Sequence, residues 1–100
     1  MADSILYTVG DSGEFYAEFR NTAGAYMDPD TVTLKLRSPS GSITPYVYGV
    51  SSYVVREGVG KYEAAIELTS EGVWQWRWEG AGSARGALEG SITVVPSSFN

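Results

Sequence analysis

The acidic residues are the side chains of this chain whose type and spacing could most readily form a metal-binding or catalytic site. Asp28 and Asp30 flank Pro29, and Asp11 and Glu14 lie in another turn-rich stretch. Calcium needs six or more oxygen ligands that converge on one point. The Asp-Pro-Asp run supplies two carboxylates at most and lacks the glycine-rich spacing of a calcium-binding loop. Because Asp and Pro favour turns, we predict turns here and no metal site.

A pair of carboxylates acting as general acid and base is a second possibility, with Glu63, Glu67 and Glu79 as candidates. Each alternates with apolar residues, so each should face water with a pKa near its ordinary value. The chain has no histidine and no cysteine, which removes the commonest general base, thiolate chemistry, disulfides and zinc–thiolate sites. The Gly-rich stretches lack the lysine of a phosphate-binding loop, and nothing indicates a cleft. We predict no catalytic residue, no cofactor and no enzymatic activity.

Charge and the first residues narrow the range of partners. The net charge of −5 argues against nucleic-acid binding and against binding to an anionic membrane. The stretch Met1-Ala2-Asp3-Ser4 carries no basic residue, and the apolar run Ile5–Val9 is too short for a signal-peptide core or a membrane span. We therefore expect synthesis in the cytoplasm, with no nucleic-acid partner and no membrane partner.

Hydrophobic periodicity predicts an all-β protein. Short alternating runs, separated by Gly, Pro, Ser and Asp, recur about every ten residues, and no window shows helical periodicity. This pattern is typical of an antiparallel β-sandwich of the Ig-like or fibronectin-III-like kind with about seven strands. The expected strands are Ile5–Val9, Glu14–Arg20, Thr31–Arg37, Ile43–Tyr48, Tyr53–Arg56, Lys61–Leu68, Val73–Glu79 and Ala87–Val95.

Three further expectations concern how these strands are organised. The 100 residues suit one domain over residues 1–100, with a short flexible tail over residues 96–100 and a mobile loop over residues 81–86. Eight runs are one more than seven, so one run should switch sheets or form a short ribbon. Pro45 has no N–H to donate, which places its strand at a sheet edge.

The largest apolar feature is the alternation of Trp74, Trp76 and Trp78, which turns all three indoles to one face of a strand. Gln75, Arg77 and Glu79 point to the other face. The indoles could fill the core between two sheets, anchor a protein interface or form a platform for sugar rings. Filling the core is the favoured interpretation, because a sandwich needs every apolar face that the chain offers.

Tyrosine is abundant, with seven residues in the chain. Exposed tyrosine gives rigid contact area at low entropic cost, which suits a protein interface. The alternative is that tyrosines cover the sheet and donate to backbone carbonyls. A hydroxyl at Tyr62 could also tie down a loop, as in a tyrosine corner. The candidate interface residues are Tyr26, Met27, Tyr46, Tyr48 and Tyr53.

Four stretches carry a family resemblance that spans most of the chain in order. They are Tyr7-Thr8-Val9-Gly10-Asp11, the run from Asp28 to Gly41, Gly60-Lys61-Tyr62-Glu63-Ala64, and the run from Gly72 to Gly80. The chain thereby resembles the small Ig-like β-sandwich structural proteins of tailed bacteriophages and prophages. In such proteins a Pro often precedes the Gly before the tryptophan strand, whereas this chain has Glu71.

The resemblance implies a virion protein that forms part of the head decoration, neck or tail. Its implied partners are other virion proteins of the capsid, neck or tail, with a homo-oligomer as an open alternative. The family has no catalytic residues to transfer. A different class of function, an extracellular carbohydrate- or surface-binding module, remains the alternative, and a phage protein that acts on the host is a third.

Overall fold

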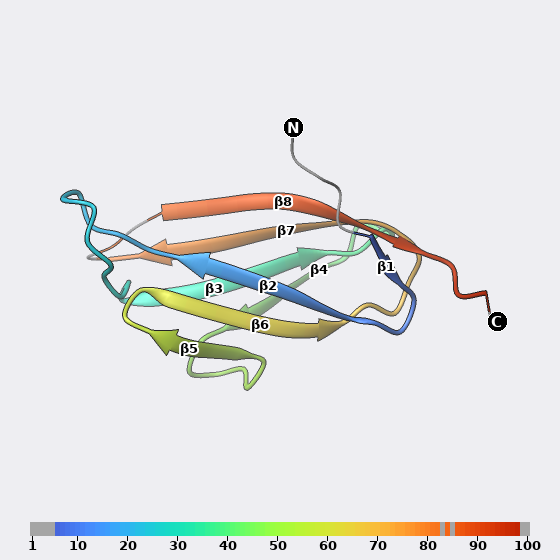
Figure 1. Cartoon of the computed structure of the whole chain (residues 1–100), viewed down its shortest axis with the longest axis horizontal. Helices are drawn as coiled ribbons and strands as arrows, with labels where there is room; N and C mark the ends of the chain where they lie inside the picture. The colour runs from blue at the N-terminus through green and yellow to red at the C-terminus, as the bar shows by residue number, and fades with distance from the viewer. Residues whose placement is uncertain (1–5, 83, 85, 99–100) are drawn as a thin grey trace.

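The computed structural model describes residues 6–82, 84 and 86–98, which form an all-β protein of eight strands (Figure 1). The strands are β1 (Leu6–Thr8), β2 (Ser12–Glu18), β3 (Thr31–Arg37), β4 (Ile43–Val47), β5 (Val54–Gly58), β6 (Lys61–Glu67), β7 (Gly72–Ala81) and β8 (Gly86–Val95). No predicted strand that lies within the described residues differs at either end by more than two residues from the observed strand, and β3 has the predicted bounds.

The strands form two sheets that pack face to face. The larger sheet has the order β1-β8-β7-β3-β4, and the smaller sheet has the order β2-β6-β5. All strand pairs are antiparallel except the pair of β1 with β8. The order β8-β7-β3-β4 over β2-β6-β5 corresponds to strands G-F-C-C′ over B-E-D of the immunoglobulin fold. The predicted Ig-like β-sandwich is therefore confirmed.

Two expectations about organisation have different outcomes. Pro45 lies on β4, the edge strand of the larger sheet, as predicted. Of the two alternatives for the eighth run, the switch between sheets was wrong, because each of the eight described strands belongs to one sheet. The additional strand is the three-residue β1, which forms a short parallel pair with β8. The predictions for residue 5, for residues 83 and 85 of the loop, and for residues 99–100 of the tail lie outside the described residues.

The core lies between the sheets and is built from their alternating inner faces. Trp78 and Leu34 are opposite each other on β7 and β3 and are fully buried. Trp74 is also buried, and its indole N–H donates to the Ser70 carbonyl at 2.9 Å. The other buried apolar residues include Phe15, Phe19, Val32, Leu36, Tyr62, Ile66, Leu68, Ile92 and Val94.

Trp76 completes the stripe as a half-buried residue on the same inner face. Its ring packs edge to face against Phe15 of β2, with 6.5 Å between the ring centroids. A Cβ at Gly90 would lie 2.6 Å from this indole, so glycine on β8 makes room for the ring. The tryptophan stripe is thus a core feature, as favoured, and not an exposed sugar platform.

The unequal burial of the three indoles can be tested by fluorescence quenching. Trp76→Phe is expected to remove most of the emission that acrylamide quenches, because Trp76 is the partly exposed indole. Trp74→Phe should leave the quenchable fraction in place. A quenchable fraction that survives Trp76→Phe would contradict the assignment.

The contribution of the central indole can be tested by unfolding. Trp78→Ala is expected to lower the free energy of unfolding by about 3–5 kcal/mol, the usual range for removing a large aromatic side chain from a core. Val50→Ala, at an exposed position, is the control and should change it by less than about 0.5 kcal/mol. Urea denaturation at neutral pH measures both values, and a small loss for Trp78→Ala would show that the sheets close over the vacated space.

Candidate functional site

Three predicted interface residues lie on one side of the sandwich, where β4 is the edge strand of the larger sheet and β5 is the edge strand of the smaller sheet (Figure 1). Tyr46 and Tyr53 pack edge to face, with 5.5 Å between ring centroids, and Tyr48 packs in the same way on the buried Tyr62 at 5.3 Å. We call Tyr46, Tyr48 and Tyr53 the tyrosine edge. Tyr48 and Tyr53 are exposed, whereas Tyr46 is half-buried and burial raises the pKa of its hydroxyl. The tyrosine edge therefore closes the side of the core and also presents aromatic surface to solvent.

The other two predicted interface residues lie in the connection between β2 and β3. Tyr26 is exposed, with the Arg20 guanidinium 3.9 Å and the Lys61 ammonium 4.6 Å from its ring centroid. Arg20 also donates a hydrogen bond to the Tyr26 hydroxyl at 2.7 Å. Met27 packs against the core, and its backbone N–H donates to the Phe19 carbonyl at 3.1 Å. Tyr26 thus offers surface, while Met27 contributes mainly to holding the connection in place.

Asp28 anchors this connection to the smaller sheet. Its carboxylate accepts hydrogen bonds from the Arg56 guanidinium at 2.9 Å, from the Gly60 backbone N–H at 2.8 Å and from the Tyr62 hydroxyl at 3.0 Å. The hydrogen bond from Arg56, helped by that from Gly60, lowers the pKa of Asp28 to about 2. Burial, together with Asp28, raises the pKa of Tyr62 to about 12. The Tyr62 hydroxyl therefore ties down a loop, as the sequence suggested, through a carboxylate.

An open hollow of about 440 Å³ lies beside this anchor. Asp28, Arg56 and Tyr62 line it together with Tyr48 of the tyrosine edge. The anchor therefore supports the tyrosine edge directly, because Tyr48 rests on the same Tyr62 ring whose hydroxyl binds Asp28.

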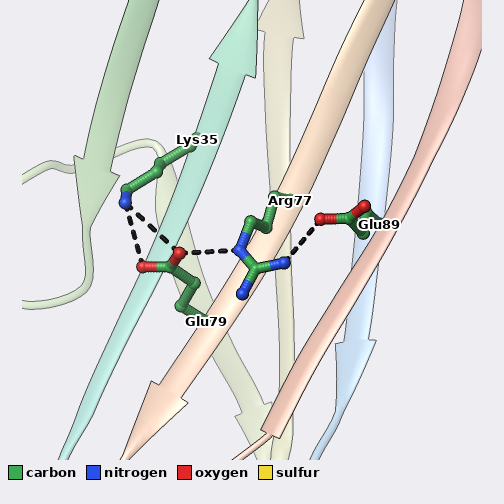
Figure 2. A network of polar contacts seen from close by, with 4 residues as sticks. All are labelled: Lys35, Arg77, Glu79 and Glu89. Carbon is green, nitrogen blue, oxygen red and sulfur yellow. Dashed lines mark hydrogen bonds and ion pairs between the residues drawn. The ribbon is translucent and has the colours of Figure 1, made fainter.

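The outer face of the larger sheet carries a chain of ion pairs, which Figure 2 shows. Glu79 binds both Lys35, at 3.1 Å, and Arg77, at 2.7 Å, and Arg77 also binds Glu89. The hydrogen bond from Arg77, followed by that from Lys35, lowers the pKa of Glu79. These side chains, with Arg37, line a second open hollow of about 650 Å³ across β3, β7 and β8.

Comparison with known proteins adds no assignment. No protein-family model matches the chain, and no curated protein matches it. Within residues 6–82, 84 and 86–98 there is no group of three or more Asp or Glu residues placed to hold a metal ion, and no helix long and apolar enough to cross a membrane.

Two expectations about carboxylates were wrong in detail. The pKa of Glu79 is lowered by its cations, and the pKa of Glu63 is raised, chiefly by a hydrogen bond with Glu57. Neighbouring side chains set these charge environments: Arg77 of the same strand and Lys35 of β3 act on Glu79, and Glu57 acts on Glu63. Neither the two hollows nor the pairing of Asp28 with Arg56 was predicted from the sequence. The spacing of Arg77 and Glu79 on one face was the available signal for the network of Figure 2.

The Asp28 anchor predicts a pH-dependent contribution to stability. Because the folded-state pKa of Asp28 lies below its usual value, the carboxylate stabilises the fold above about pH 4, and this contribution is lost as the pH falls through about 2. Asp28→Asn should therefore lower the urea midpoint at pH 7, and the difference from the wild type should shrink towards pH 2. Glu67→Gln, at an exposed position, is the control. An equal deficit of Asp28→Asn at both pH values would contradict the role of the charge.

Proposed function

We propose that this protein is a non-enzymatic structural protein of a tailed-phage virion that assembles on the head, neck or tail through protein–protein contacts. The tyrosine edge is the proposed docking surface for other virion proteins. The virion function is supported by the resemblance of the chain to small Ig-like phage proteins. The choice of docking surface is supported by the arrangement of the tyrosine side chains.

The observation that carries the proposal is that the tyrosine edge is both exposed and held in place. Tyr53 is supported by Tyr46, and Tyr48 is supported by Tyr62, so the rings present contact area without losing much freedom on binding. Tyrosine is enriched at protein interfaces because an apolar ring and a polar hydroxyl can both be used there. The neighbouring hollow beside Asp28 and Arg56 offers a place for a polar group of the partner.

A surface-binding module for carbohydrate remains a second candidate because of the hollow on the larger sheet. Gln75, Arg77, Glu79 and Ser91 line it with groups that can donate and accept hydrogen bonds, as sugar hydroxyls require. The burial of the tryptophan stripe removes the aromatic platform that would favour this function. Glycan titration followed by NMR shifts at these residues separates the two functions.

The docking surface can be tested with Tyr53→Asp in the phage or prophage that encodes the chain. A charge at the tyrosine edge would have to be desolvated in the interface, so we expect incorporation into particles to be lost. Tyr16→Asp is the matched control, since Tyr16 is 59% exposed on the smaller sheet and Tyr53 is 55% exposed. Quantitative mass spectrometry of purified particles measures incorporation, and circular dichroism checks that both variants fold.

The possible outcomes distinguish a wrong docking surface from a wrong virion function. Normal incorporation of Tyr53→Asp would rule out the tyrosine edge as the docking surface. Absence of the wild-type protein from particles would instead overturn the virion function as a whole.

A further inference from the structure

The first part of β8 is a sheet edge that no described strand covers. β1 pairs with β8 only over Thr93, Val94 and Val95. Residues 86–92 therefore have β7 on one side and no described partner on the other. In Figure 1, β8 is the uppermost of the strands.

The direction of the backbone groups along this edge follows from the hydrogen bonds around it. The carbonyl of Val95 accepts a hydrogen bond from the N–H of Val9, so residue 95 directs its backbone groups away from β7. Because these directions alternate along a strand, the N–H and C=O of Ala87, Glu89 and Ser91 point to the uncovered side. The groups of Leu88 and Gly90 point to β7.

The edge strands β2, β4 and β5 carry features that hinder strand pairing, whereas the uncovered part of β8 carries only the charge of Glu89. β4 contains Pro45, and β5 has a register shift between Arg56 and Gly58. On β2, the N–H of Glu14 already binds the Tyr7 hydroxyl at 3.3 Å. Proline, bulges and occupied donors are the usual protection of edges. Residues 86–92 of β8 contain no proline, no lysine and no register shift.

We propose that two copies of this chain pair through this edge, with their β8 strands antiparallel about a twofold axis at Leu88. Leu88 is on the inner side of the sheet, opposite the buried Trp78 of β7, and is 40% exposed. In the pair, Leu88 of each copy lies against Leu88 of the other, at a position where opposite side chains approach closely. Ala87 and Glu89 of each copy then exchange backbone hydrogen bonds with Glu89 and Ala87 of the second copy.

Two neighbouring registers are less favourable. A twofold axis at Glu89 would set two carboxylates directly opposite each other, and like charges in that position are destabilising. An axis at Gly90 would bring Ala87 of the second copy beside Thr93, where Leu6 of β1 already lies. The axis at Leu88 avoids both conflicts and covers an exposed apolar side chain. The dimer does not depend on the virion function.

The dimer is tested by sedimentation equilibrium of the purified chain. The edge is short, so we expect weak association, with the mass rising from 10.8 kDa towards twice that value as the concentration approaches about 1 mM. Ala87→Pro should abolish the rise, because it removes an edge-facing N–H and leaves the hydrogen bonds to β7 intact. Ala87→Ser, which keeps the N–H, should still associate.

A second pair of variants tests the apolar contact. Leu88→Arg places like charges at the axis and should keep the protein monomeric. Val55→Arg is the matched control, since Val55 is 47% exposed on β5, and it should still associate. Circular dichroism and thermal unfolding must show that all variants fold, and Ala87→Pro and Leu88→Arg probe the edge independently.

Hydrogen exchange locates the contact. In the proposed dimer, the amides of Ala87 and Glu89 become protected as the concentration rises, while those of Leu88 and Gly90 are protected at every concentration. A wild type that stays monomeric at about 1 mM overturns the proposal. Protection of Glu89 and Ser91 without Ala87 overturns the register, and protection of all edge amides in the monomer would mean that the chain covers its own edge.

Discussion

The burial of the indoles on β7 is the constraint on which the rest of the structure depends. Strand β7 lies at the centre of the larger sheet, and its alternation turns the tryptophan stripe inward. The side chain of Trp78 is fully buried, although its N–H has no hydrogen-bond partner among the described residues. An unpaired buried donor costs about 1–3 kcal/mol, which burial of so large an apolar ring is able to offset. The smaller sheet is therefore held to the larger one chiefly by apolar packing.

Several smaller features follow from making room for these rings. Gly90 is on β8 because a Cβ there would meet Trp76 at 2.6 Å. Without a side chain at that position, β8 contributes little cover, and both Trp76 and Leu88 stay partly exposed at this side of the sandwich. On the opposite side, the tyrosine edge closes the core with aromatic rings instead. One side of the sandwich therefore leaves apolar side chains partly exposed, whereas aromatic rings cover the core on the other side.

The fold could be predicted well from the sequence, because β2, β3 and β6 alternate between buried and more exposed positions along their whole length. The observed bounds of β3 are those predicted from the sequence, and Pro45 correctly indicated an edge strand. The surface was harder to predict, because its properties depend on pairs of residues brought together by long-range strand register. Asp28 and Arg56 are 28 residues apart, and Lys35 and Glu79 are 44 apart. No local pattern contains such pairs, so the Asp28 anchor and the link from Lys35 to Glu79 could be recognised only in the structure. The spacing of Arg77 and Glu79 was the local signal for the rest of the network in Figure 2.

The two proposed contact surfaces lie on opposite borders of the larger sheet, since β8 is near one end of its strand order and β4 is at the other. A dimer joined at β8 would form one continuous sheet with a tyrosine edge at each far border. Such a dimer is bivalent. Once one tyrosine edge is bound, the other is held near its partner at a high effective concentration, so two weak contacts together bind more tightly than one. A weak twofold contact closes on itself and does not extend into a fibre. The geometry is therefore suited to linking neighbouring subunits of a larger assembly by pairs.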